Sequence, residues 1–171
     1  MKTISPTCFF IVCICLSLRF SIFAQNGSGA SSDKVIYRGN PTSAISSSVT
    51  IPADKKYFYS SGTLGPVVDS TAVAGSRERY GDTKTQAIGI LEKFKADLAK
   101  EGLGLGNIVF MRVYVAPDTK TGKMDFQGWF DAYAQYFGTK ENPVKPSRST
   151  IGIAQLVNPD RFIEIEIVAV Y

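Results

Sequence analysis

Hydrophobic and polar residues alternate strictly in the C-terminal stretch from Pro146 to Tyr171, which contains two such runs joined by a short loop. Strict alternation is typical of a β-strand whose two faces differ in character. The first run places Arg148, Thr150 and Gly152 on one face, and Ile151 and Ile153 on the other. We therefore expect a strand that carries a guanidinium on its polar face.

The second run carries a pair of carboxylates. One face of this run is Glu164, Glu166, Val168 and Val170, and the other is Ile163, Ile165 and Ile167. Two neighbouring strands of opposite charge can bring an anion-binding group and a general base into one site. The stretch 146–171 is therefore the first candidate for a functional site.

Four further runs predict strands, at 35–38, 44–51, 56–61 and 107–116. In the last of these, one face is apolar: Val109, Met111, Val113 and Val115. The other face carries Arg112 between Phe110 and Tyr114. The stretch 63–80 is rich in Gly, Pro, Ser and Ala and is expected to be a loop, and loops of this length are often functional.

Apolar residues recur at helical spacing in two segments, which predict helices over 82–102 and 125–138. In the first helix, Thr83 and Gln86 have the spacing of a capping box, and Gly102 marks the end. The second helix can be capped by Asp125 and ends at Gly138. Its aromatic stripe is Phe126, Trp129, Phe130, Tyr133 and Phe137. Such a stripe is more often core than a cofactor site, and we interpret it as core.

The order of the elements predicts an α+β fold, with both helices on one face of a mixed sheet. The other face is expected to carry Arg148, Thr150, Glu164 and Glu166 among apolar neighbours. Such a face is too apolar for water and too charged for a closed core. We therefore expect it to associate with other copies of the chain, with the sites at subunit interfaces.

The N-terminal residues have the layout of a secretory signal peptide: Lys2, an apolar run from Cys8 to Leu18, and a cleavage site after Ala24. The apolar run is short for a membrane span, although a membrane anchor is the alternative. We predict a signal peptide at 1–24, a flexible linker at 25–33 and a folded domain at 34–171. The mature protein is then periplasmic or secreted, with no membrane association after cleavage.

Composition narrows the possible chemistry. The chain has no histidine, and its three cysteines, Cys8, Cys13 and Cys15, all lie in the expected signal peptide. The domain therefore lacks imidazole bases, thiolate nucleophiles and Cys/His zinc sites, which leaves carboxylates, lysines, tyrosines and water. Cleavage also removes Lys2 and Arg19, and the nearly neutral remainder gives no electrostatic basis for binding nucleic acid.

Several motifs together resemble the RidA (YjgF/YER057c/UK114) family: Y-S-S-G near position 60, G-D-T-x-x-Q-A from Gly81, N-I-V-F-M-R-V-Y-V, Y-A-Q-Y-F-G, P-S-R-S-T and I-E-I-E-I-V-A-V. The resemblance covers about Tyr37 to Tyr171. It implies a chorismate-mutase-like (bacillus-type) domain that forms homotrimers with clefts between subunits. It also implies hydrolysis of reactive enamines and imines, such as 2-aminoacrylate and 2-iminobutanoate, to 2-keto acids and ammonia.

The resemblance also implies roles for individual residues. Arg148 would clamp the substrate carboxylate, for which a planar guanidinium fork is suited, and Thr150 would contact the ligand through its backbone. Glu164 would orient or activate water, and Gly62 with Ser61 would form the neighbouring subunit's wall of the cleft. This 2-iminobutanoate/2-iminopropanoate deaminase-like chemistry needs no metal or cofactor. Two positions differ from many family deaminases: Ser48 replaces a tyrosine, and Phe130 replaces a polar residue, commonly asparagine.

Other interpretations stay open. On the residues alone, Arg148 and Glu164 could be a structural ion pair across an interface. Glu166 and Arg112 are interpreted as structural. The protein could also be a trimeric module that binds a small carboxylate without turnover. An endoribonuclease, which older descriptions of the family suggest, is the weaker alternative, because histidine is absent and the net charge is small.

Overall fold

A computed structural model of the protein describes residues 33–171. The predicted signal peptide and the predicted linker up to residue 32 lie outside the described residues. Within the described range, no helix has both the length and the apolar character needed to span a membrane.

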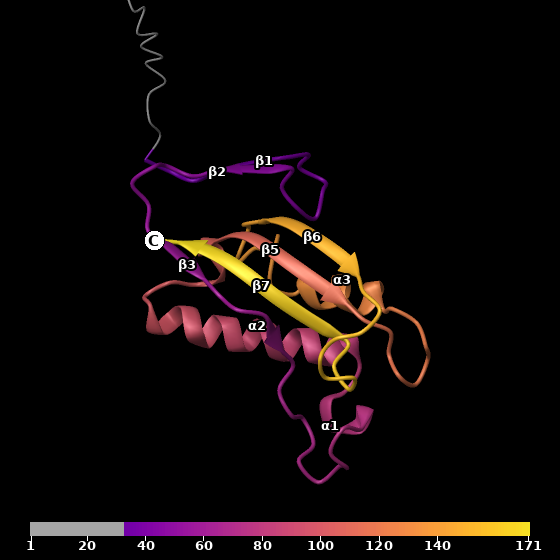
Figure 1. Cartoon of the computed structure of the whole chain (residues 1–171). Helices are drawn as coiled ribbons and strands as arrows, with labels where there is room; N and C mark the ends of the chain where they lie inside the picture. The colour runs from indigo at the N-terminus through magenta and orange to yellow at the C-terminus, as the bar shows by residue number, and fades with distance from the viewer. Residues whose placement is uncertain (1–32) are drawn as a thin grey trace, which may run out of the picture. The chain divides into compact units, whose positions relative to one another are not determined.

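A mixed five-stranded sheet forms the centre of the described domain (Figure 1). Its strands are β3 (Tyr57–Tyr59), β4 (Thr63–Leu64), β5 (Ile108–Val115), β6 (Ser147–Gly152) and β7 (Ile163–Val170). β7 runs antiparallel to β3, β4 and β5, whereas β5 and β6 are parallel. Two further strands, β1 (Ile36–Arg38) and β2 (Ser48–Thr50), pair separately. The predicted α+β class with a mixed sheet is confirmed.

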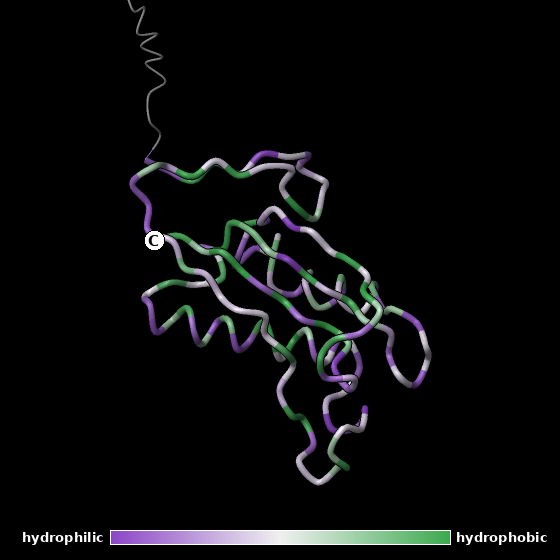
Figure 2. The backbone as a smooth tube through the Cα atoms, viewed as in Figure 1, coloured by the Kyte–Doolittle hydropathy of each residue, from purple (hydrophilic) through white to green (hydrophobic). Residues whose placement is uncertain are grey.

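Two helices, α2 (Thr83–Lys100) and α3 (Phe126–Tyr133), cover one face of this sheet (Figure 1). Hydrophilic and hydrophobic residues alternate along the coil of α2, as Figure 2 shows, and its apolar stripe joins the core. The isoleucines of β7 and the apolar face of β5 are buried in the same cluster. The alternation predicted for these two strands is therefore confirmed.

β6 has the opposite orientation to the one predicted. Its parallel pairing sets Arg148 beside Met111 and Thr150 beside Val113, and both β5 residues face the helices. Ile151 pairs with Tyr114 on the open face and is 44% exposed. The expectation that Arg148 and Thr150 share the uncovered face with Glu164 and Glu166 is therefore wrong.

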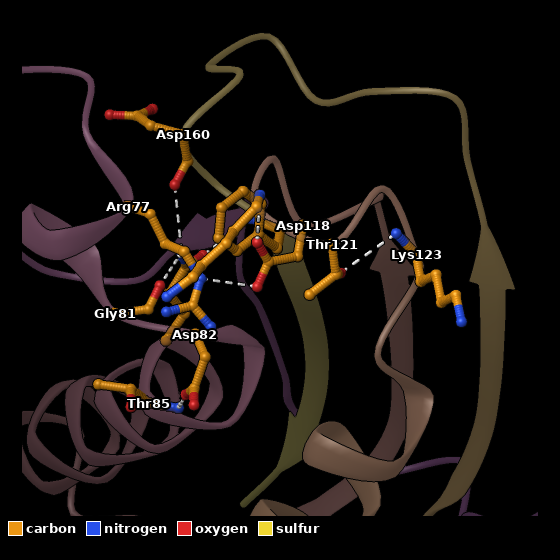
Figure 3. A network of polar contacts seen from close by, with 11 residues as sticks. Arg77, Gly81, Asp82, Thr85, Asp118, Thr121, Lys123 and Asp160 are labelled. Atoms are coloured by element: carbon orange, nitrogen blue, oxygen red, sulfur yellow. Dashed lines mark hydrogen bonds and ion pairs between the residues drawn. The ribbon is translucent and has the colours of Figure 1, made fainter.

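The stretch 63–80 is more ordered than the predicted loop. It contains β4 and a short helix, α1 (Arg77–Tyr80). Arg77 Nε donates to Asp118 Oδ2 at 2.8 Å, an ion pair whose acid is buried (Figure 3). Arg161 Nε donates to the Gly65 carbonyl, and its guanidinium stacks on the Tyr80 ring. Side chains from distant parts of the sequence therefore hold this segment in place.

The helix ends also differ in part from the predictions. Asp82 is the N-cap of α2 and accepts from the Thr85 N–H, so the predicted capping box is wrong. A short 3₁₀ turn, η1 (Leu105–Asn107), precedes β5. Asp125 caps α3 as predicted, but the helix stops at Tyr133 and turns carry the chain to Gly138, whose φ is +70°.

Gln86 is fully buried and joins α2 to the loop before β7. Its Nε2 donates to the carbonyls of Gly81 and Asp160, and its Oε1 accepts from the Phe162 N–H at 2.9 Å. The variant Gln86→Leu keeps the volume but leaves these three backbone groups unpaired. We expect the free energy of unfolding to fall by about 2–4 kcal/mol, as measured by urea denaturation.

The matched control is Gln127→Leu on α3, because Gln127 is exposed and bonds only Asp131 one turn away. This variant is expected to change the free energy of unfolding by less than about 0.5 kcal/mol. Equal effects of the two variants would contradict the assigned role of Gln86.

Candidate functional site

Arg148 projects from β6 into a cluster of aromatic rings on α3. Its guanidinium carbon lies 4.2 Å from the ring centroid of Tyr133, 5.2 Å from that of Trp129 and 5.3 Å from that of Phe130. We call these three rings the aromatic cage. Such contacts stabilise a cation by about 0.5–2 kcal/mol each, more where water is excluded.

The Arg148 cation has no compensating anion among residues 33–171. Its Nη1 atom is buried and makes no hydrogen bond within the described domain. Burial lowers the pKa of Arg148, yet a guanidinium stays charged in proteins. A half-buried, unpaired cation is costly, and an anionic ligand would supply the missing partner.

Two hydrogen bonds fix the cage in place. Trp129 Nε1 donates to Thr150 Oγ1 at 3.3 Å, and the Tyr133 hydroxyl donates to the Ala44 carbonyl at 3.1 Å. Burial raises the pKa of Tyr133 to about 12, so this hydroxyl stays protonated at neutral pH. The aromatic stripe was interpreted as core, and this holds for Trp129, Tyr133 and Phe137, but Phe130 is 40% exposed.

A cavity of about 460 Å³ opens beside Arg148. Its lining comes from the β1–β2 connection, from α3 with the turn that follows it, and from the approach to β6: Thr42, Ser43, Ala44, Phe130, Tyr133, Ala134, Phe137, Gly138, Lys145 and Arg148. We call it the α3 cavity. Its volume lies within the range of about 300–1,000 Å³ typical of ligand pockets.

Glu164 lies on the open face of the sheet, in contact with Gly62. The pairing of β4 with β7 sets Leu64 opposite Glu164, and a Cβ atom at Gly62 would overlap Glu164 Oε1. Only glycine therefore fits at position 62 with Glu164 in this place. Within residues 33–171 the Glu164 carboxylate has no hydrogen-bond or ion-pair partner, whereas Glu166 pairs with Arg112 at 3.1 Å.

Ser61 and Gly62 also line a cavity of about 580 Å³ between the β3–β4 segment and α2. The charges on its helical wall pair with one another, because Lys93 and Lys100 both contact Asp97 at 2.7 Å. Glu101 also lines this cavity and brings the charges on its helical wall to a balance of two lysines and two carboxylates, whereas Arg148 in the α3 cavity has no anion beside it within the described residues.

The predicted site residues thus form two groups within one chain. Arg148 and Thr150 lie on the helix side of the sheet, and Glu164, Gly62 and Ser61 lie at the other face and its edge. Arg148 and Glu164 make no ion pair within the chain, and the structural ion pair across an interface stays a prediction. Sequence reasoning missed the cage, because an aromatic stripe at helical spacing looks the same whether it packs on apolar groups or on a cation.

Comparison with known proteins gives a consistent family match. A family model described as Endoribonuclease L-PSP matches residues 41–171. A search of curated protein sequences gives no match.

Several solved structures are similar to the chain. TdcF from E. coli, solved with bound serine, is 26% identical over 71% of this chain and 84% of its own, with a TM-score of 0.52. The YjgF gene product from E. coli is 30% identical over 67% of this chain and 80% of its own, with a TM-score of 0.51. YyfB of the Rid family from Yersinia pestis is 20% identical over 80% of this chain and 98% of its own, with a TM-score of 0.59.

Proposed function

Because the chain belongs to the Endoribonuclease L-PSP family, also called RidA/YjgF/YER057c/UK114, we propose that it hydrolyses 2-imino acids to 2-keto acids and ammonia. Members of this family commonly deaminate enamine and imine intermediates. The observation that carries the proposal is the unpaired Arg148 cation in its aromatic cage. TdcF, the relative with bound serine, supports a ligand that carries the carboxylate of an amino acid.

In the proposed reaction, Arg148 binds the substrate carboxylate through paired, charge-assisted hydrogen bonds. Water adds to C2 of the protonated imine, the π electrons of the C=N bond move to nitrogen, and Glu164 accepts the proton that water releases. The resulting carbinolamine takes that proton on its nitrogen. Glu164 then accepts the hydroxyl proton as the C–N bond breaks, which gives the 2-keto acid and ammonia. Ammonia takes this proton from Glu164 and leaves as ammonium.

This reaction needs Arg148 and Glu164 in one site, although they lie on opposite faces of the sheet in one chain. The proposed site is therefore shared between two copies: one supplies Arg148 and Thr150, and the next supplies Glu164, Gly62 and Ser61. A ring of three subunits repeats such a site at each interface. In this arrangement the apolar side chains of the open face, such as Ile151, are covered by the neighbouring copy.

We further propose that the mature protein acts after export, in the periplasm or outside the cell. This proposal rests on the signal-peptide pattern of residues 1–24.

The aromatic cage also favours a second candidate, a module that binds a small carboxylate without turnover. The cage with Arg148 is sufficient for binding, because it contains the cation and needs no base. Only the proton transfer requires Glu164.

The deciding experiment uses an amino-acid oxidase to generate 2-imino acid in the presence of semicarbazide, which traps it. The chain from residue 25 onward is expected to suppress trapping of the imino acid by semicarbazide. It is also expected to release 2-keto acid faster than the uncatalysed hydrolysis in buffer does. If trapping is unchanged while benzoate or a 2-keto acid still raises the melting temperature, the protein is a binding module and not a hydrolase.

A further inference from the structure

The wall of the α3 cavity next to Arg148 is apolar. Phe130, Ala134 and Phe137 follow one another at helical spacing along it, and both Phe130 and Ala134 are exposed to solvent. The Phe130 ring lies 5.3 Å from the Arg148 guanidinium carbon and also lines the cavity. A ligand whose carboxylate lies on Arg148 therefore has this wall directly beside its remaining atoms.

The other polar side chains that line the cavity, on the β1–β2 connection and at Lys145, already have partners within the chain. Thr42 Oγ1 donates to Asn40 Oδ1, and Ser43 Oγ accepts from the Ile45 N–H. Lys145 Nζ donates to the carbonyls of Pro41 and Ser43, both at 2.8 Å. These groups are engaged in holding the β1–β2 connection, so little polar capacity is left to recognise a hydroxyl or amide on a ligand.

The cavity is also large for a short ligand. Before the neighbouring copy's Glu164 and Ser61 are counted, a three-carbon imino acid held on Arg148 would fill only part of the 460 Å³ and would leave a wall of rings and methyl groups in contact with water. Covering that wall with an apolar substituent releases this water and stabilises the complex by about 25 cal/mol per Å² of apolar surface removed from water.

We propose that the substrate class of this site is the 2-imino acids with large apolar side chains, aromatic or branched, which lie along Phe130 and Ala134. This inference rests on the proposed function for its reaction. It adds that Phe130 and Ala134 determine specificity, and that imines with polar or very short side chains are poor substrates.

The test compares imines made from alanine, serine, leucine and phenylalanine by an amino-acid oxidase of broad specificity. In the trapping assay, kcat/KM for the leucine- and phenylalanine-derived imines is expected to exceed that for the alanine-derived imine by at least about tenfold. The serine-derived imine is expected to resemble the alanine-derived one. Equal values across the series, or a preference for alanine or serine, would overturn the inference and leave the proposed function standing.

Two variants at exposed positions distinguish an effect of the cavity wall on substrate preference from a general loss of folding or activity. Phe130→Ala removes the ring and is expected to reduce the preference for phenylalanine over alanine by about tenfold. Ala134→Leu narrows the cavity and is expected to reduce kcat/KM for the largest imines more than that for the alanine-derived imine. Val157→Ala is the control, because Val157 is 96% exposed and lines no cavity next to Arg148. Unchanged preference in both wall variants would overturn the inference.

A binding measurement keeps the inference testable if the protein proves not to be a hydrolase. Phenylpyruvate is expected to raise the melting temperature at concentrations at least about tenfold lower than pyruvate, and Phe130→Ala is expected to reduce this ratio. If no imine is turned over and this ranking holds, the proposed function fails and the preference for apolar ligands stands. If pyruvate binds as well as phenylpyruvate, the preference fails.

Discussion

Replacing Arg148 with alanine is expected to lower kcat/KM for imine hydrolysis by about 10²–10³-fold. The variant removes the cation that meets the carboxylate in a largely desolvated cage, and loss of one partner from such a charged pair costs about 2–5 kcal/mol. Arg148→Lys is expected to recover little of the activity, because a point charge lacks the planar fork and stacks less well on the rings. The trapping assay gives kcat/KM for each variant.

The control for this prediction is Arg38→Ala. Arg38 is exposed and its Nη1 donates to Thr50 Oγ1, far along the chain from the cage. It is expected to leave kcat/KM unchanged. Arg148 has no acidic partner within residues 33–171, so its removal leaves no buried carboxylate without a partner. The variant is therefore expected to fold. A folded Arg148→Ala protein with full activity would contradict the assigned role.

Chains carrying Arg148→Ala and chains carrying Glu164→Gln are each expected to be inactive, yet active when mixed in the same oligomer. The reason is geometric: the two side chains lie on opposite faces of one sheet, so the proposed site must take them from different copies. With random mixing at equal amounts in a symmetric ring, about a quarter of the interfaces regain both residues. Co-expression at equal levels, purification through one tag common to both chains, and the trapping assay measure the recovered activity.

A chain carrying both substitutions, mixed equally with the unaltered chain, is the matched control. If each site takes Arg148 and Glu164 from two copies, about a quarter of the sites in this mixture are again complete. If each site lies within one chain, about half of the sites are complete. No recovery in the first mixture together with about half the activity in the second would contradict the shared site.

The orientation of β5 and β7 was predictable from the sequence. Each of these strands buries one face completely, and this burial imposes the alternation of apolar and polar residues. The orientation of β6 was not predictable. β6 is an edge strand whose helix side meets aromatic rings, and such rings accept a guanidinium as readily as they accept an isoleucine. The pattern Arg148–Ile151 therefore suggested the wrong orientation, and only the register with β5 decides it.

The candidate site followed a similar division. The motifs of the sequence single out Arg148, Glu164 and Gly62 as site residues. That Arg148 and Glu164 lie on two different faces of the sheet follows from the pairing of the strands, which no local sequence pattern encodes. The order within 63–80 was hidden for a related reason. That segment is held by Arg77 on Asp118 and by Arg161 on Tyr80, contacts between residues far apart in the chain.

β7 follows the other described strands in chain order, yet it lies between β5 on one side and β3 and β4 on the other. At translation rates of about 5–20 residues per second, β5 and the apolar stripe of α2 therefore wait a few seconds for their main partner during synthesis. The sheet cannot be completed before β7 has left the ribosome. A truncation that removes β7 would leave the domain without the centre of its sheet.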